Sequence, residues 1–247
     1  MMNGVTGVSP PQGPVLDPLI IYGHDSRDSL LPIMVAVENG KPEGGMLLFT
    51  EPVASPSGKL GLPMHGYYDY ATASAWLIAV GCMRASFDSW VELLYKNKGA
   101  AVVEEARAKL FDQQIICNVL TAGRGVGGRS CGAGMILSLA CMVFQCRFRR
   151  DTVITGELTA SGCVSSVGSA PEKVDLAAKH GKTRMILPAS CKAAIVTDRA
   201  KRKKRKGGGT TRSGDAVELI GVKDIWETLD EYLVIDPPGE CTISFTL

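Results

Sequence analysis

The sequence predicts a protein of mixed helices and strands, of the α+β class. Two observations carry this prediction. Segments typical of strands and of helices are interleaved without strict alternation, and apolar residues make up 45% of the 247 residues, as in ordinary globular proteins. A chain of this length buries a substantial core without disulfides or metals. Its charged fraction of 21% is compatible with that core and excludes disorder throughout.

The elements of the first half follow from apolar periodicity and from the positions of glycine and proline. Residues 1–18 are rich in Gly, Pro and Val, and a loose N-terminal leader is predicted over 1–32. After it the sequence favours strands over 32–37 and 45–50, a turn at 56–58 before residues 59–62, helices over 71–94 and 100–110, and a strand over 115–120. Gly81 weakens the case for one unbroken helix over 71–94.

The second half continues the mixture. A glycine-dense loop over 122–132 is followed by an expected helix over 133–146, a strand over 152–158, a hairpin arm over 162–167, a helix over 171–180, a strand over 183–188 and a helix over 223–233. Pro171 in the first turn and Gly181 just past the end support the helix over 171–180. Together these elements are expected to form one domain over 33–236, with a C-terminal tail over 237–247.

One charged segment stands apart from the periodic pattern. Lys201–Lys206 are six consecutive basic residues, and three glycines follow them. Like charges repel and glycine is costly to order, so the sequence predicts a basic, flexible insert at 200–213. The alternatives left open are a nuclear-localisation signal, an RNA contact or a processing site.

The overall charge excludes several classes of partner. Lys and Arg outnumber Asp and Glu by 27 to 25, so bulk electrostatics does not hold this chain on nucleic acid or on a membrane surface. A nucleic-acid partner is expected only through the basic insert. The longest apolar run, Met135–Phe144, is too short to span a membrane. With no signal or transit pattern at the N-terminus, we expect a cytoplasmic protein, with a nuclear location as the alternative that Lys201–Lys206 leaves open.

The cysteines and histidines indicate whether disulfides or a metal site are expected. The eight cysteines form no CxxC pair and several lie in apolar runs, which predicts reduced, buried side chains. The three histidines, His24, His65 and His180, are not at metal-ligand spacing. We therefore expect no metal and no cofactor.

The glycine-dense loop allows three interpretations. The segment Gly123-(four residues)-Gly128-Arg129-Ser130 resembles a phosphate-binding loop, but Arg129 replaces the lysine that such loops require. The same residues, Gly128-Arg-Ser-Cys-Gly132, fit GxSxG, in which the serine is a nucleophile on a strand-to-helix turn. A purely structural glycine loop is the third interpretation.

A nucleophilic Ser130 requires a base, and two residue types could supply it. His180 is the only histidine after Ser130, but it ends a predicted helix and too little chain follows it for an α/β-hydrolase. Lys173 begins a predicted helix among small, mostly uncharged residues, where burial and the helix N-terminus both favour the neutral amine. The alternative for Lys173 is a surface lysine paired with Glu172 or Asp175.

In these segments the sequence resembles the proteolytic domain of Lon proteases, which use a Ser-Lys dyad. The family's nucleophile motif is matched by Gly128–Gly132, its threonine-glycine-glutamate strand and hairpin by Thr155–Gly168, and its lysine segment by Glu172–Ala178. Residues 47–51 and 57–62 resemble the domain's opening hairpin, and residues 183–188 resemble its late strand. The resemblance thus covers roughly 33–235, and the segment over 155–188 is highly specific. The resemblance implies the Lon-protease-domain fold, which is ribosomal S5 domain 2-like, and a polypeptide substrate.

The resemblance also implies roles for individual residues. Ser130 and Lys173 would be the catalytic dyad. Backbone N–H groups of the turn formed by Gly128, Arg129, Ser130 and Cys131 would form the oxyanion hole. Thr155 would accept a hydrogen bond from Lys173, and Glu157 would be structural.

The sequence departs from the family motif at several points. Arg129 stands in place of a proline and Gly127 in place of an acidic residue, and the family's histidine-bearing strand and proline-glutamate turn are here Cys117–Gly123. No ATPase module is recognised in the sequence, so we expect an ATP-independent serine endopeptidase acting on unfolded proteins or on a polyprotein, as birnavirus proteases do. A homo-oligomer is left open. The alternative function is a catalytically silent Lon-fold module for binding or assembly.

Overall fold

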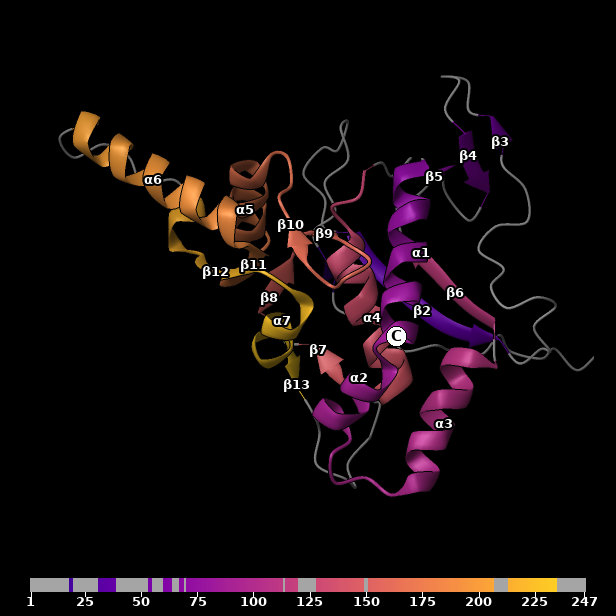
Figure 1. The fold of residues 1–247 in the computed structure, drawn as a ribbon. Helices are drawn as coiled ribbons and strands as arrows, with labels where there is room; N and C mark the ends of the chain where they lie inside the picture. The colour runs from indigo at the N-terminus through magenta and orange to yellow at the C-terminus, as the bar shows by residue number, and fades with distance from the viewer. Residues whose placement is uncertain are drawn as a thin grey trace, which may run out of the picture.

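A computed structural model describes residues 18–19, 31–38, 53–54, 60–63, 67–68, 70–112, 114–119, 128–148, 151–206 and 213–234. Helices and strands are mixed along the chain, which confirms the α+β prediction (Figure 1). Several sequence predictions lie outside the described residues: the strand over 45–50, the turn at 56–58, most of the glycine-dense loop and the tail over 237–247. Within the predicted leader, Pro18–Leu19 form the short strand β1, which pairs with β2.

Two three-stranded sheets frame the site described below. In the first, β1, β2 (Leu31–Glu38) and β6 (Gln114–Val119) are antiparallel, and Val35 is paired with Cys117. In the second, β8 (Thr152–Ile154), β11 (Arg184–Pro188) and β12 (Glu218–Val222) are parallel, with β11 in the centre. The sequence predicted β11 closely but gave no indication of β12.

The remaining strands are short. They form antiparallel pairs of β9 with β10 and β7 with β13, and a small sheet in the order β3-β4-β5. Their bounds are β3 Val53–Ala54, β4 Leu60–Pro63, β5 Tyr67–Tyr68, β7 Arg147–Phe148, β9 Glu157–Leu158, β10 Val164–Ser165 and β13 Leu233–Val234. The strand predicted over 152–158 is thus two strands, β8 and β9, separated by Thr155 and Gly156.

The central element of the larger core is α4 (Gly132–Phe144). All thirteen of its residues are buried, and α1, α3, β2 and β9 contact it. At its C-terminal end, the Phe144 ring stacks on those of Phe87 and Trp90, with ring centroids 5.9 and 6.0 Å apart. A helix that is apolar on every side is stable only when covered in this way.

The helices around α4 differ in one respect from the prediction. The helix expected over 71–94 is two helices, α1 (Tyr70–Ala85) and α2 (Phe87–Leu94), and the break falls at Ser86 rather than at Gly81. Ser86 Oγ donates to the Cys82 carbonyl at 2.7 Å, beside the Ser86 N–H at 3.1 Å, and a side-chain bond of this kind bends helices. The third helix, α3 (Ala100–Phe111), follows closely the prediction over 100–110.

A second, smaller core lies on the parallel sheet. The helices α5 (Ala170–Lys179) and α6 (Ala189–Lys206) pack there with the 3₁₀ turn η1 (Ser213–Ala216), and α7 (Ile225–Tyr232) follows β12. Gly181 has a φ of +69°, so it ends α5 in the left-handed conformation that its position predicted.

The basic run corrects one sequence expectation. Lys201–Lys206 are not part of a loop: they continue α6, which extends from the body at the upper left of Figure 1. A lysine- or arginine-rich last turn is favoured by the negative end of the helix dipole, which offsets part of the repulsion within the run. Residues 207–212 of the predicted insert lie outside the described part of the chain.

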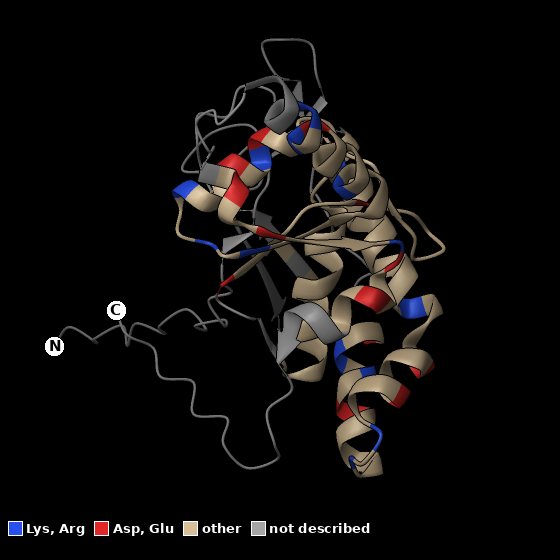
Figure 2. Ribbon diagram, turned by 90° about the vertical axis from the view of Figure 1, so that its left-hand side faces the viewer, with Lys and Arg blue, Asp and Glu red and all other residues tan. Residues whose placement is uncertain are grey.

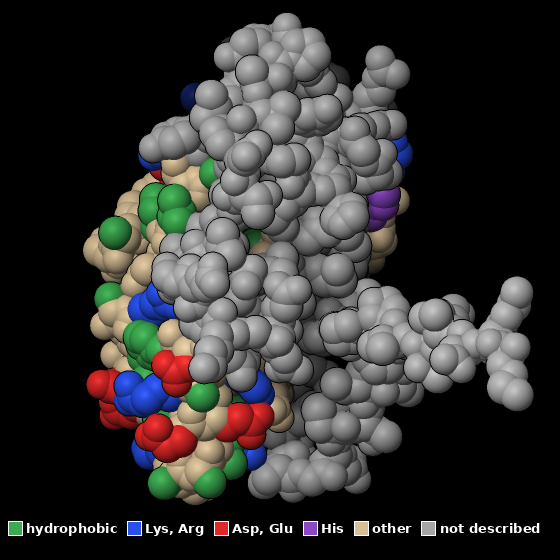
Figure 3. Space-filling model, turned by 90° about the vertical axis from the view of Figure 1, so that its right-hand side faces the viewer, with side chains coloured by type: hydrophobic (Ala, Val, Ile, Leu, Met, Phe, Trp, Pro, Cys, Tyr) green, Lys and Arg blue, Asp and Glu red, His purple; other side chains and the backbone are tan. Residues whose placement is uncertain are grey.

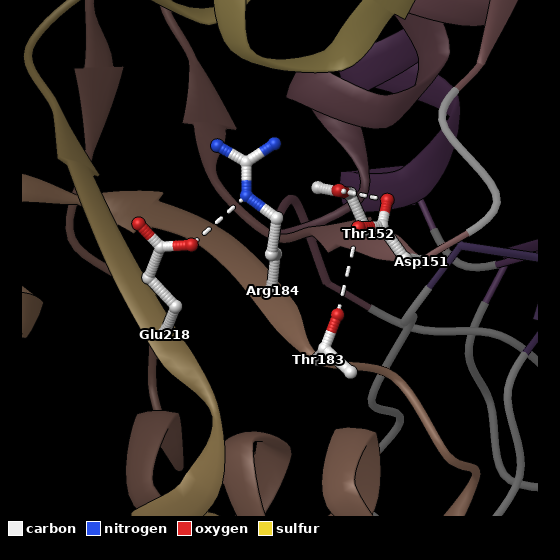
Figure 4. A network of polar contacts seen from close by, with 5 residues as sticks. All are labelled: Asp151, Thr152, Thr183, Arg184 and Glu218. Carbon is white, nitrogen blue, oxygen red and sulfur yellow. Dashed lines mark hydrogen bonds and ion pairs between the residues drawn. The ribbon is translucent and has the colours of Figure 1, made fainter.

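Polar contacts fasten one end of the parallel sheet (Figure 4). Asp151 accepts hydrogen bonds from Thr152 at 2.9 Å and from Thr183 at 3.5 Å, and Arg184 forms an ion pair with Glu218 at 3.0 Å. These contacts connect the N-terminal ends of β8, β11 and β12. The opposite, carboxyl end of β8 leads into Thr155, whose N–H donates to the Ile186 carbonyl at 3.0 Å.

Charge is mixed on the described surface. Lys and Arg alternate with Asp and Glu along the outer helices in Figure 2, and both signs also occur together low on the face shown in Figure 3. On α3, Arg107 pairs with Glu104 at 3.8 Å, and Lys109 pairs with Glu105 at 2.7 Å. No helix in the described ranges is long and apolar enough to cross a membrane.

Candidate active site

The candidate nucleophile lies on a turn that leads directly into α4. Gly128 has a φ of +93°, in the left-handed region that glycine adopts without strain. Two residues on, Ser130 is partly exposed, whereas Cys131, at the N-cap of α4, is buried. The Gly132 N–H closes the turn on the Arg129 carbonyl at 3.0 Å. The turn therefore keeps the hydroxyl-bearing residue near the surface while the helix enters the core.

The chain after β8 holds this turn in place. The Gly156 N–H donates to the Ser130 carbonyl at 2.9 Å, and the Ala133 N–H donates to the Gly156 carbonyl at 3.1 Å. Gly156 has no room for a side chain because a Cβ there would overlap Cγ1 of Val164. Close approach of two backbones therefore fixes the turn against the end of the parallel sheet.

Lys173 lies in the first turn of α5 with a side chain that is only 1% exposed. Its Nζ donates a hydrogen bond to Thr155 Oγ1 at 3.1 Å. Burial lowers the pKa of Lys173 from 10.5 to about 8, against the opposing influence of the Cys131 and Cys191 thiols. An appreciable fraction of the amine is therefore neutral near neutral pH, which a general base requires.

Thr155 connects the two candidate dyad residues. Its Oγ1 accepts from Lys173 and donates to the carbonyl of Ser130 at 3.3 Å. Thr155 itself is fully buried, so water does not compete for either bond. Three sequence segments, 128–132, 155–156 and 170–173, thus converge at the carboxyl end of β8.

Among the described residues, no hydrogen bond joins the candidate nucleophile directly to the candidate base. Among the contacts of the described residues, the hydrogen bonds to Ser130 all involve its carbonyl, and none joins its Oγ to Lys173 Nζ. Catalytic hydrogen bonds of this kind are often long in a free enzyme and form only with substrate. His180 lies exposed at the C-cap of α5.

The two residues that flank the serine in the motif differ in environment. Arg129 forms an ion pair with Glu157 of β9 at 3.2 Å, with both side chains partly in solvent. The Cys131 thiol instead points inward and contacts the Gly128 carbonyl at 3.6 Å. The arginine that replaces the family's proline is therefore held by the residue we expected to be structural.

Sequence analysis missed Thr72. This residue of α1 is 1% exposed, and its Oγ1 donates to the Gly128 carbonyl at 3.1 Å. It thereby ties the start of the nucleophile turn to a helix 56 residues earlier in the chain. The sequence offered one signal for Thr72, a threonine on the buried side of a predicted helix. This signal is ambiguous, because such a threonine often bonds a carbonyl in the preceding turn of its own helix.

No metal cluster accompanies the site in the part of the chain that the structure describes. No group of three or more His, Cys, Asp or Glu side chains gathers there at coordinating distance.

The chain belongs to the family of C-terminal proteolytic domains of Lon proteases (S16), whose family model matches residues 43–204. This match confirms the resemblance found in the sequence. It spans the nucleophile turn, the Thr155 segment and Lys173.

Curated relatives agree with this assignment. The chain is 33% identical over 150 residues to the Lon protease of Methylocella silvestris, covering 60% of this chain and 16% of that protein. It is 29% identical over 181 residues to the Lon protease of Phenylobacterium zucineum, covering 73% and 21%, and 29% identical over 199 residues to that of Koribacter versatilis, covering 80% and 21%. The chain thus spans about a fifth of the length of these relatives.

Proposed function

We propose that this chain is a serine endopeptidase of the Lon type, with the Lon-protease-domain (ribosomal S5 domain 2-like) fold, that cleaves peptide bonds through a Ser130–Lys173 dyad. The observation that carries this proposal is the buried hydrogen-bond path from Lys173 through Thr155 to the residue that bears the nucleophile. A structural lysine gains nothing from such burial, since desolvation of the ammonium costs free energy.

The reaction would proceed in two halves. Ser130 Oγ attacks the scissile carbonyl while neutral Lys173 takes its proton, and the resulting ammonium then protonates the leaving amine. A water molecule, deprotonated by Lys173 in turn, hydrolyses the acyl-enzyme and restores Ser130. The hydrogen bond to Thr155 Oγ1 at 3.1 Å helps to position Nζ for both transfers.

Backbone N–H groups of the turn from Gly128 to Cys131 would stabilise the oxyanion. Such donors act best when fixed before the reaction, and one of them is worth about 10²–10³ in rate in serine peptidases. The turn is fixed here from three sides: by Thr72 at Gly128, by Gly156 at the Ser130 carbonyl, and by the start of α4.

We further propose that peptide hydrolysis by this chain needs no nucleotide. The segment that resembles a phosphate loop ends in Arg129 and Ser130, and Arg129 is engaged by Glu157. Unfolded proteins or a polyprotein are the proposed substrates. Addition of ATP to the purified chain should leave the rate of peptide hydrolysis unchanged, and stimulation by ATP would contradict this part of the proposal.

The test of the dyad is a comparison of three purified chains on an unfolded protein substrate. Wild type should produce fragments, and mass spectrometry should also find its self-cleavage products. Ser130→Ala should produce neither while keeping its thermal stability. His180→Ala should behave as wild type, because His180 lies exposed at the end of α5.

One observation favours a second candidate, a catalytically silent module for binding or assembly. Arg129 and Glu157 place a charged pair beside the nucleophile, where the family carries a proline. If the pair blocks the substrate, Arg129→Pro should gain peptide hydrolysis that the wild-type chain lacks. Activity in wild type that is lost in Ser130→Ala eliminates this candidate.

A further inference from the structure

Two buried thiols are in contact at the C-terminal end of α4. Cys141 lies in the last turn of the helix, and Cys146 is the second residue beyond its end. Their Sγ atoms are 3.6 Å apart, and the two residues are 5% and 8% exposed. Nearly the whole length of α4 separates this pair from Ser130, so the proposed peptidase chemistry does not use it.

The local backbone explains why these two positions meet. Gln145, between them, has φ and ψ of 51° and 41°, so the chain ends α4 in the left-handed conformation. In this type of helix end, the second residue after the helix folds back over the last turn and contacts the residue five positions earlier. An apolar pair usually fills those two positions. Here both are cysteine.

Surrounding contacts hold the C-terminal end of α4 in this conformation. The Gln145 side chain donates to Glu105 of α3 at 3.3 Å. On the other side, the Tyr95 ring packs edge-on against Phe144, with ring centroids 5.2 Å apart. The two thiols therefore stay adjacent without help from a crosslink, which is the preorganisation that a disulfide with little strain needs.

We propose that Cys141 and Cys146 form a dithiol modification site, which a small peroxide converts reversibly to a disulfide. One thiolate attacks a peroxide oxygen, becomes a sulfenic acid and releases water. The second thiol then attacks that sulfur, forms the S–S bond and releases a second water. Two electrons and two protons pass from the thiols to hydrogen peroxide, and a small dithiol reductant returns them. Closure requires the sulfur atoms to approach from 3.6 Å to about 2.05 Å.

Burial selects the oxidant. Because the two residues are only 5% and 8% exposed, we expect a small peroxide to reach the pair more readily than a protein disulfide or an arylating reagent. Cys191 is a matched control within the same chain. It is equally buried, at 7%, but its thiol contacts the Val167 carbonyl at 3.7 Å instead of a second sulfur.

The experiment uses the full chain carrying Ser130→Ala, so that self-cleavage does not interfere and the result does not depend on the proposed peptidase function. The folded protein is treated with hydrogen peroxide, unfolded in a maleimide that alkylates every free thiol, and digested with chymotrypsin. Cleavage after Phe144 separates Cys141 from Cys146 unless a disulfide joins them. We expect the two fragments to remain linked in most of the protein, and to separate after reduction.

Two variants make the result specific. Cys146→Ser should give no linked fragments, and Cys191→Ser should leave the linked fragments unchanged. The proposal fails if Cys141 and Cys146 are still alkylated after the exposed Cys163 has been oxidised. It also fails if Cys141 is found joined to another cysteine. In either case the pair only fills space at the helix end.

Discussion

Thr155 Oγ1 lies 3.1 Å from Lys173 Nζ and, through its own hydrogen, bonds the carbonyl of Ser130 at 3.3 Å. One hydroxyl therefore orients the proposed base and supports the backbone of the proposed nucleophile. Thr155 is the first residue after β8, so the parallel sheet positions this hydroxyl for both hydrogen bonds. A change at Thr155 should disturb the site in two ways at once.

Substitution of Thr155 tests this dual role. Thr155→Val keeps the shape but removes both hydrogen bonds, and we expect kcat/KM for a peptide to fall about 10²-fold, in the range of lost proton-transfer geometry. Thr155→Ser keeps the hydroxyl and should retain most of the activity. Thermal unfolding of both variants serves as the control, and equal activity of the two would show that the hydroxyl has no catalytic part.

The pH dependence of activity should report Lys173. With its pKa lowered to about 8 by burial, the amine is mostly protonated below that pH and mostly neutral above it. Activity should therefore rise with pH through about 8 and level off, rather than near the 10.5 of an exposed lysine. Lys173→Arg should be inactive at every pH, because arginine stays protonated. Near-normal turnover of Lys173→Arg would exclude the dyad.

The same lysine should lower the stability of the fold near neutral pH. Its folded pKa lies below its unfolded pKa, so the unfolded chain binds more protons between about 8 and 10.5, and unfolding free energy rises with pH in that window. Below about pH 8 the penalty is present in full, at about 3 kcal/mol from the pKa difference. Lys173→Met should raise the melting temperature at pH 7, with a smaller gain at pH 10. A melting temperature that falls at pH 7 would contradict this.

Thr72 should position the turn without taking part in the chemistry. Thr72→Val removes the hydrogen bond to the Gly128 carbonyl, and we expect kcat to fall several-fold to tenfold with KM and the pH midpoint near 8 unchanged. Thr72→Ser should restore kcat. A displaced pH midpoint in Thr72→Val would mean that the residue acts on Lys173 instead.

Two glycines should respond oppositely to alanine. A Cβ at Gly132 would lie 3.0 Å from the Leu158 backbone nitrogen, so Gly132→Ala should destabilise the chain by about 1–3 kcal/mol through overpacking. A Cβ at Gly81, an exposed position inside α1, meets no atom within 4 Å. Gly81→Ala should therefore stabilise by about 0.5–1 kcal/mol. Denaturant titration measures both, and equal effects would contradict the close approach of β9 to α4.

Prediction from the sequence was most accurate where a local pattern decides the structure. The α+β class and the helices over 100–111, 132–144 and 170–179 follow from periodicity and from the residues at helix ends. It was least accurate for β12, whose half-buried pattern depends on pairing with β11, and for the break at Ser86, which depends on one side-chain hydrogen bond. It was wrong for Lys201–Lys206. Charge repulsion within the run predicted a loop, but these residues continue the helix α6 that precedes them.

At the site, residue types and motif spacing made Ser130 and Lys173 candidates, the resemblance to Lon proteases added Thr155, and the structure gathers these segments at one sheet end. The sequence could not predict Thr72, because its partner is a backbone carbonyl 56 residues away. Nor could it predict that Arg129 pairs with Glu157, since such a contact depends on where β9 lies relative to the turn. Long-range contacts of this kind leave no periodic pattern in the sequence.

The complete burial of α4 has a consequence for the motions of the molecule. Thirteen residues without a solvent-facing side release their amide hydrogens only when the surrounding helices and strands separate. The segment that carries Ser130 at one end and the Cys141–Cys146 pair at the other is therefore expected to be among the slowest to exchange with deuterated water. The proposed nucleophile, Ser130, lies just before this element and should therefore keep its position while the rest of the molecule fluctuates.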